Sequence, residues 1–142
     1  MKQIAIYGAF DRFNYGDMLF PIILEQILKE YSSDYKLKYY GIINSDLSKF
    51  CGKRTKSILS LFDESNLDDG SIVIVAGGEV LGTDWFTILS FLMPFDLKIF
   101  TDACQENIPR NMLSSISPTI HRKKLEYPYI ICPEDFDSKV KI

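Results

Sequence analysis

The most informative segment of this chain is Gly8-Ala-Phe-Asp-Arg-Phe-Asn-Tyr-Gly-Asp17, which follows an apolar run at residues 4–7. A helix is predicted to begin directly after this segment, with Asp17 as its N-cap. A buried strand, a glycine-containing loop and a helix start form the ligand-binding corner of open α/β sheets. Free backbone N–H groups and the helix dipole at such a corner favour a negatively charged ligand group. We therefore expect Asn14, Gly16 and Asp17 to line a binding site.

A purely structural interpretation of this loop is also open. In it, Asn14 adopts a left-handed turn conformation, Gly16 relieves steric crowding and Asp17 only caps the helix. The glycines are too far apart for the fingerprint Gly-x-Gly-x-x-Gly, and the Lys-Ser or Lys-Thr pair of a P-loop is missing. The loop is longer than the usual strand-to-helix connection of about 2–6 residues, and long loops at this edge of a sheet are often functional.

A second glycine-rich turn, Ala76-Gly77-Gly78-Glu79, follows the strongest strand signal in the sequence, Ile72-Val-Ile-Val75. Gly77 and Gly78 allow a backbone or a ligand to approach closely. Glu79 has three open roles: orienting a sugar hydroxyl, acting as a general base, or pointing into solvent. Because the carboxyl ends of parallel strands share one edge of a sheet, we expect the two turns to face one crevice.

The first half of the chain alternates between strand and helix patterns. Strands are predicted at residues 3–7, 36–43 and 71–76, a helix at 55–62 and a turn at 68–70. In the helix after the first loop, Pro21 is expected in the first turn, and six apolar residues are expected on the buried face: Phe20, Ile23, Leu24, Ile27, Leu28 and Tyr31. This pattern predicts a three-layer α/β fold with a parallel sheet, in which residues 4–7 and 72–75 are central strands.

The second half of the chain gives weaker signals. A helix is expected at residues 84–92 and strands at 97–100 and 127–132, with only short helical pieces at 101–124. Residues 139–142 resemble the start of a strand that stops. We interpret residues 1–142 as one domain that forms the N-terminal half of a longer, two-domain protein.

Composition excludes several classes of function. The hydrophobic fraction is 46%, the charged fraction is 25% and the net charge is −3, which argues against a nucleic-acid surface. The three cysteines form no Cys-x-x-Cys pair, and the longest apolar stretch is far shorter than the roughly 20 residues of a membrane span. A cytoplasmic protein is expected.

Few residues in this sequence are candidates for metal or nucleophilic chemistry. His121 is the single histidine, so neither a Ser-His-Asp nor a Cys-His arrangement is proposed. Asp135 and Asp137 are interpreted first as an acidic turn. No metal site and no cofactor are expected.

Two segments resemble the polysaccharide pyruvyl transferase family: Phe13-Asn-Tyr-Gly-Asp-Met-Leu-Phe-Pro21 and Ile72-Val-Ile-Val-Ala-Gly-Gly-Glu-Val-Leu81. That family has an Asn-x-Gly-Asp motif in its first strand-to-helix loop and a Gly-Gly turn after a later strand. The resemblance covers about the first ninety residues, and residues 127–136 more loosely. It departs from the family at Glu79, which replaces the usual third glycine.

The resemblance implies the N-terminal Rossmann-like domain of a GT-B-like, two-domain transferase. Such enzymes move a pyruvyl group from phosphoenolpyruvate onto two hydroxyls of a sugar or glycolipid acceptor, forming a ketal in exopolysaccharide biosynthesis at the membrane. Asp17 or Glu79 would be the general base. Arg12, Asn14 and Gly16 would bind substrate from the first loop, and Gly77 and Gly78 from the second.

The family's donor-binding cations come largely from the second domain, so the isolated chain is expected to be inactive. Two alternatives are open. One is a non-catalytic α/β module that binds a sugar or a nucleotide, and the other is a structural or regulatory protein derived from a transferase half.

Overall fold

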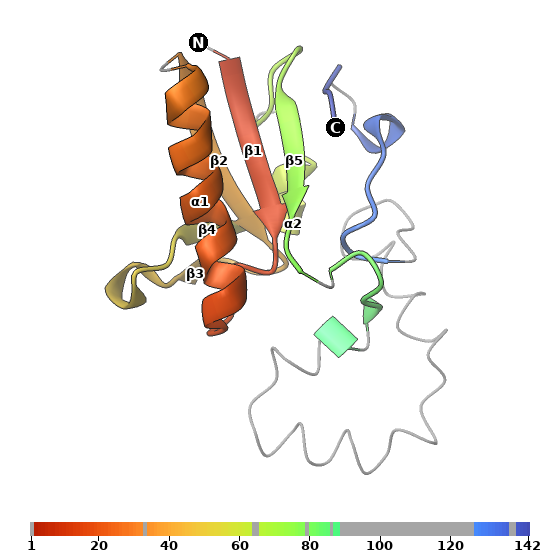
Figure 1. Cartoon of the computed structure of the whole chain (residues 1–142). Helices are drawn as coiled ribbons and strands as arrows, with labels where there is room; N and C mark the ends of the chain where they lie inside the picture. The colour runs from red at the N-terminus through yellow and green to blue at the C-terminus, as the bar shows by residue number, and fades with distance from the viewer. Residues whose placement is uncertain are drawn as a thin grey trace. The chain divides into compact units, whose positions relative to one another are not determined.

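The computed structural model describes residues 2–32, 34–63, 66–78, 80–85, 87–88, 127–136 and 139–142. The chain divides into two compact units, Met1–Val80 with Ile131–Ile142, and Leu81–Ile130. The strands and helices whose bounds are given below belong to the first unit, and Figure 1 shows them as a sheet with helices packed on it. This arrangement confirms the expected α/β class for the described part of the chain.

The sheet of the first unit has five strands in the order β3-β4-β2-β1-β5. Strand β1 pairs in parallel with β2 and β5, and β4 pairs in parallel with β2, whereas β3 is antiparallel to β4. The expected all-parallel sheet is therefore wrong in one respect, because the sheet is mixed. The bounds are β1 Lys2–Gly8, β2 Tyr35–Gly41, β3 Ser45–Asp46, β4 Arg54–Ser57 and β5 Ile72–Ala76.

The strand order reverses direction between β1 and β5. Among the parallel strands, β2 and β4 follow β1 on one side, and the chain then crosses to the other side to add β5. This is the order of the first four strands of doubly wound α/β sheets, which bind ligands outside the carboxyl ends of the strands where the order reverses. The two glycine-containing turns follow the two strands at this point.

The prediction that residues 72–75 form a central strand is wrong. Within the described residues, β5 is the last strand in the order, and its outer side carries an isolated bridge from Ile72 to Lys141. Only Val73 of the strand is buried, at 1% exposure, while its neighbours are half-buried. A β-branched apolar run indicates a strand with buried faces, but it does not indicate how many neighbouring strands pair with it.

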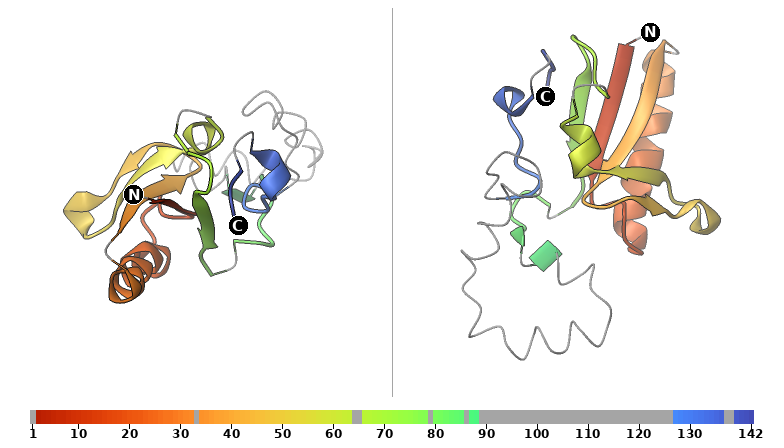
Figure 2. Two further views of the ribbon diagram at one scale, coloured as in Figure 1. Left: turned by 90° about the horizontal axis from the view of Figure 1, so that it is seen from above. Right: turned by 180° about the vertical axis from the view of Figure 1, so that it is seen from behind.

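Helices lie on both faces of the sheet, as Figure 2 shows. Helix α1, Tyr15–Tyr31, covers one face, where Ile4, Ile6 and Phe10 form a core with Phe20 and Leu24. Helix α2, Ile58–Leu61, is a single turn on the other face.

The helix predicted at residues 55–62 is helical only in its second half. Arg54–Ser57 is β4, and only Ile58–Leu61 is helical. Pairing of Lys56 with Tyr40 in the ladder to β2, together with burial of Thr55, outweighs the weak helical pattern.

Helix α1 buries fewer apolar side chains than its pattern predicts. Phe20, Leu24 and Leu28 pack against the core, but three expected core residues are exposed by 51%, 43% and 83%: Ile23, Ile27 and Tyr31. Both rows repeat every fourth residue, and the row of Phe20, Leu24 and Leu28 is the one that contacts the sheet.

Pro21 lies inside α1 and not in its first turn, because the helix begins at Tyr15. Since proline has no N–H, the Asp17 carbonyl receives no bond from residue 21.

Two further predictions, a turn and a strand, have opposite outcomes. The turn at residues 68–70 is confirmed, with Gly70 at a φ of 82°. The strand predicted at 127–132 is wrong: Tyr127 to Ile130 form a turn closed by the Ile130 N–H on the Tyr127 carbonyl at 3.2 Å. Pro128 at that position cannot donate to a ladder.

The C-terminal part of the first unit adds one further helical turn and the bridge to β5. A 3₁₀ turn, η2, spans Pro133–Asp135, and Lys141 forms the bridge to β5.

The described start of the helix predicted at residues 84–92 is helical at Trp85, Thr87 and Ile88. Its N-cap is Asp84, whose side chain accepts the Thr87 N–H at 2.9 Å. The rest of that helix, together with the predictions for residues 97–100 and 101–124, lies outside the described residues.

Candidate functional site

Asn14, and not Asp17, is the N-cap of α1. Its backbone is extended, with φ −134° and ψ 111°, and its side-chain oxygen accepts the Gly16 N–H at 3.1 Å. The Asn14 carbonyl also accepts the Met18 N–H at 2.9 Å. The left-handed conformation considered for Asn14 is therefore wrong as well. The helix starts early because the short Asn14 amide reaches the first free N–H groups.

Three residues predicted for the site form one polar network. The Asp17 carboxylate atom Oδ2 accepts from Asn14 Nδ2 at 3.0 Å and lies 3.9 Å from Arg12 Nε. The side chains of Arg12 and Asp17 are exposed by only 14% and 15%. The start of α1 thus brings together Arg12, Asn14 and Asp17.

This network changes the kind of ligand expected at the start of α1. Asp17 already places a negative charge at the helix N-terminus, and the Gly16 N–H is already taken by Asn14. A phosphate or carboxylate there would meet a carboxylate. A carboxylate has about four lone-pair positions, so Asp17 retains capacity to accept hydrogen bonds from hydroxyl groups. The arrangement therefore suits a hydroxyl-bearing ligand better than an anion.

The second predicted turn leaves the same edge of the sheet from the neighbouring strand. Gly8, the last residue of β1, is in register with Ala76, the last residue of β5. A Cβ added to Gly8 would lie 2.0 Å from the Ala76 carbonyl oxygen, so the two backbones approach closely at this edge. Figure 1 shows the arrowheads of β1 and β5 ending side by side. That the two turns face one crevice remains a prediction, and Glu79 lies outside the described residues.

The fold requires some motif glycines and not others. A Cβ on Gly77 would lie 2.6 Å from a methyl group of Val80, so this position needs glycine. A Cβ on Gly78 would meet nothing within 4 Å, and one on Gly16 would meet only the Asn14 side-chain oxygen at an ordinary 3.5 Å. Neither residue has the positive φ that favours glycine. Packing and backbone strain therefore do not account for Gly16 and Gly78.

The sequence did not identify Asp11, a buried residue that holds the first loop against the end of β2. It is exposed by only 4%, and its carboxylate accepts the Ile43 N–H at 3.0 Å. A Cβ on Gly41 would lie 2.7 Å from Asp11 side-chain atoms, so β2 ends in contact with this carboxylate. Burial raises the pKa of Asp11, opposed by the Ile43 N–H and the Arg12 charge. An acidic residue in a loop gives no sequence signal of burial.

Sequence reasoning also missed a cavity of about 560 Å³ beside α1 and β2. Glu25 lies in its wall and accepts from Tyr39 Oη at 3.0 Å, from Lys29 Nζ at 2.7 Å and from Lys53 Nζ. The hydrogen bonds from the two lysines lower the pKa of Glu25 to about 2. None of the described residues of the two motif loops lines this cavity, whose wall is Glu25, Leu28, Lys29, Ser32, Tyr35, Leu37, Tyr39 and Lys53.

The described residues contain no group of three His, Cys, Asp or Glu side chains that could hold a metal ion. Within the same residues, no helix is both long and apolar enough to cross a bilayer. His121 and Asp137 lie outside the described part of the chain.

No protein-family model, curated protein or solved structure matches this chain.

Proposed function

We propose that this chain is the Rossmann-like, acceptor-binding half of a polysaccharide pyruvyl transferase with a GT-B-like arrangement of two domains. The observation that carries the proposal is the position of the two motif loops. They follow β1 and β5, which are paired in parallel at the point where the strand order reverses. The Asn-x-Gly-Asp and Gly-Gly segments that resemble the family thus fall where doubly wound sheets bind ligands.

The reaction sets the requirements for the residues. Two sugar hydroxyl oxygens become bonded to the central carbon of phosphoenolpyruvate, its methylene group becomes a methyl group, and the bond to phosphate breaks. Of the two hydroxyl protons, one reaches the methylene carbon and the other leaves with the phosphate. A carboxylate that accepts a hydroxyl proton assists this step. We assign that role to Asp17, with Glu79 as the second candidate.

The remaining site residues would orient the acceptor. Asn14 holds Asp17 through its amide, and Arg12 lies beside the same carboxylate oxygen. Gly16 and Gly78 would let a sugar approach the backbone, which supplies the reason for glycine that the fold itself does not. Phosphoenolpyruvate would be held by cations of a second domain. The protein would act in the cytoplasm, where membrane-bound glycans are assembled.

A specific observation favours a second candidate, a non-catalytic sugar- or nucleotide-binding module. The contacts of Asn14 and Arg12 with the Asp17 carboxylate go to one oxygen and come from its own loop. A carboxylate held in this way can orient a hydroxyl without removing its proton. Turnover separates the two candidates, because both bind a sugar but only one consumes phosphoenolpyruvate.

Glycine variants test whether the two loops bind a ligand. Gly16→Ala and Gly78→Ala are tolerated sterically by the fold, so both variants should keep the stability of the wild type within about 1 kcal/mol. If a sugar approaches the backbone here, each variant should weaken the binding of acceptor glycans, measured by NMR titration, at least tenfold. Gly82→Ala is the matched control, since a Cβ there also meets nothing within 4 Å. Undiminished binding by both loop variants would contradict the proposed site.

Activity of the chain by itself is a separate prediction. Holding donor and acceptor together contributes roughly 7–11 kcal/mol in such reactions. Loss of this positioning slows a reaction by about five powers of ten or more. We expect no phosphate release from phosphoenolpyruvate and pooled glycans. Saturable release that Asp17→Asn abolishes would mean that one domain suffices.

A further inference from the structure

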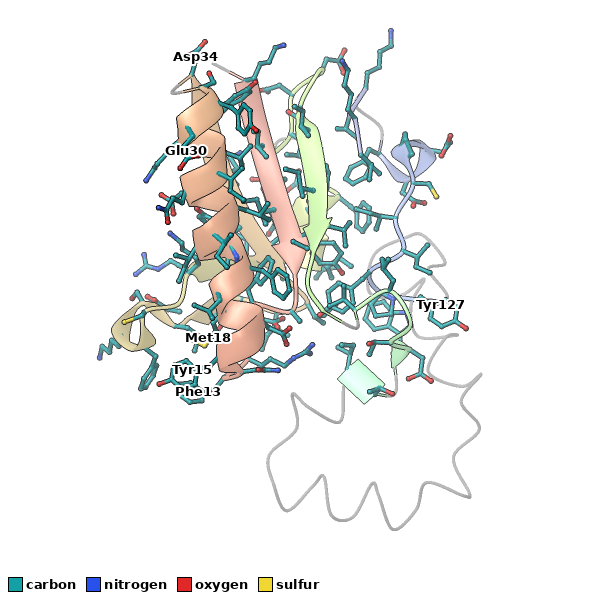
Figure 3. The ribbon with its side chains drawn as sticks, in the orientation of Figure 1. Phe13, Tyr15, Met18, Glu30, Asp34 and Tyr127 are labelled. Carbon is teal, nitrogen blue, oxygen red and sulfur yellow. The ribbon has the colours of Figure 1, made fainter. Side chains whose placement is uncertain are left out.

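Three exposed aromatic side chains contact one another, two beside the start of α1 and one in the connection between β3 and β4. Phe13, Tyr15 and Phe50 are exposed by 57%, 64% and 50%. Phe13 contacts both other rings edge to face, with centroid distances of 5.2 Å to Tyr15 and 5.1 Å to Phe50. We call these three residues the aromatic cluster. Figure 3 shows Phe13 and Tyr15 together at one end of α1, with Glu30 at the other end.

The fold holds the aromatic cluster in place without using it as core. Phe50 ends the 3₁₀ turn η1, Ser48–Phe50, which follows β3. The loop after η1 packs on α1, because a Cβ on Gly52 would lie 2.9 Å from the Met18 methyl group. The Gly52 N–H also donates to the Leu47 carbonyl at 2.9 Å. Two segments thus present the rings to solvent: the loop after β1 carries Phe13, and the connection between β3 and β4 carries Phe50.

The aromatic cluster is continuous with the polar network of the candidate site. Asn14, which caps α1 and holds Asp17, lies between Phe13 and Tyr15 in the chain. Small-molecule sites combine aromatic side chains with a few precisely placed polar groups, and this surface offers both kinds of group. A sugar ring matches such a surface, because its C–H groups form an apolar face and its hydroxyls project from the rim.

We propose that the aromatic cluster is the platform on which a sugar ring of the acceptor stacks, while a hydroxyl of that sugar donates to Asp17. This inference rests on the proposed function and names the acceptor subsite within it. A nucleotide is the less favoured ligand, because its phosphates would meet the Asp17 carboxylate on a chain of net charge −3.

Ring-deletion variants of the full chain test this inference with methyl glycosides of glucose, galactose and mannose as probes. Tyr15→Ala should weaken the tightest of these interactions at least tenfold by saturation-transfer NMR, and Tyr15→Phe should retain it. Tyr31→Ala is the matched control, since Tyr31 is an exposed tyrosine at the other end of the same helix. Its binding should equal that of the wild type.

The outcomes separate the subsite from the function. Wild-type affinity in Tyr15→Ala, together with lost affinity in Gly16→Ala, would overturn the aromatic platform and leave the proposed function standing. Absence of sugar binding by the wild type would overturn both. Preferential binding of uridine monophosphate that Tyr15→Ala abolishes would assign the rings to a nucleotide base and contradict the sugar platform. Far-UV circular dichroism and unfolding curves confirm that each variant is folded.

Discussion

Asp11 and Glu25 are two carboxylates of the same unit whose surroundings shift their pKa values in opposite directions. Burial dominates at Asp11, where backbone hydrogen bonds, above all from Ile43, and the neighbouring Arg12 charge do not offset the loss of water. At Glu25, two lysines and a tyrosine hydroxyl supply donors at a partly exposed position. Neither carboxylate was among the predicted site residues. Asp11 nevertheless determines how the first loop leaves β1.

The first prediction follows from these pKa directions. Because the pKa of Asp11 is raised in the folded protein, folding takes up a proton at pH values above the ordinary pKa of 3.8. The free energy of unfolding of the wild type, relative to that of Asp11→Asn, should therefore rise as the pH falls from neutral to 3.8. At Glu25 the sign is reversed. The free energy of unfolding of the wild type should exceed that of Glu25→Gln by about 1 kcal/mol at neutral pH, and this difference should be lost as the pH falls from 4.5 to about 2. Urea unfolding at several pH values measures both differences, and two pH-independent differences would contradict the assignment.

At the scale of the element, α1 depends on one side chain for its start. Asn14 both caps the helix and donates to Asp17, so its structural and functional roles can be separated by substitution. Serine retains a capping oxygen but has no amide to hold the carboxylate.

The second prediction uses this difference. Asn14→Ala should lower the free energy of unfolding by about 1 kcal/mol, whereas Asn14→Ser should lower it by only a few tenths. Both substitutions should weaken sugar binding, since each leaves Asp17 without the amide contact. Thermal unfolding and glycan titration provide the two measurements. If Asn14→Ser retains full affinity, the amide does not orient Asp17.

At the scale of the whole first unit, the vulnerable feature is the outer side of β5. Residues that are distant in sequence cover it by backbone hydrogen bonds: Val73 N–H donates to Lys141 O at 2.7 Å, and Lys141 N–H donates to Ser71 O at 2.9 Å. Lys139 O accepts the Gly70 N–H at 2.7 Å. A sheet edge without such cover pairs readily with other chains.

The third prediction is that deletion of residues 139–142 exposes this edge. Hydrogen exchange at Val73 should accelerate, and the protein should self-associate in size-exclusion chromatography coupled to light scattering. Ile142→Ala is the control, because it shortens an exposed side chain and keeps the backbone. A monomeric deletion variant with an unchanged exchange rate at Val73 would show that the bridge does not protect β5.

Local sequence patterns were sufficient for the elements whose formation depends on neighbouring residues. The apolar runs of β1 and β5, the helical repeat of α1 and the turn at residues 68–70 were predicted with small errors at their ends. The binding role assigned to the residues of the first loop remains a prediction, but their contacts with one another follow from local sequence. Their common polar network follows from the spacing of Arg12, Asn14 and Asp17 around one helix start.

Only tertiary structure decided the features that depend on contacts between distant segments. Pairing with β2 made residues 54–57 a strand, and the crossing of the chain after α2 placed β5 at an edge. The flat contact with the sheet left one apolar row of α1 exposed, and the ends of β1 and β2 buried Asp11 together. Sequence determines which residues can form a strand, a helix or a cap. Burial and strand order depend on which segments meet, and no local pattern contains that information.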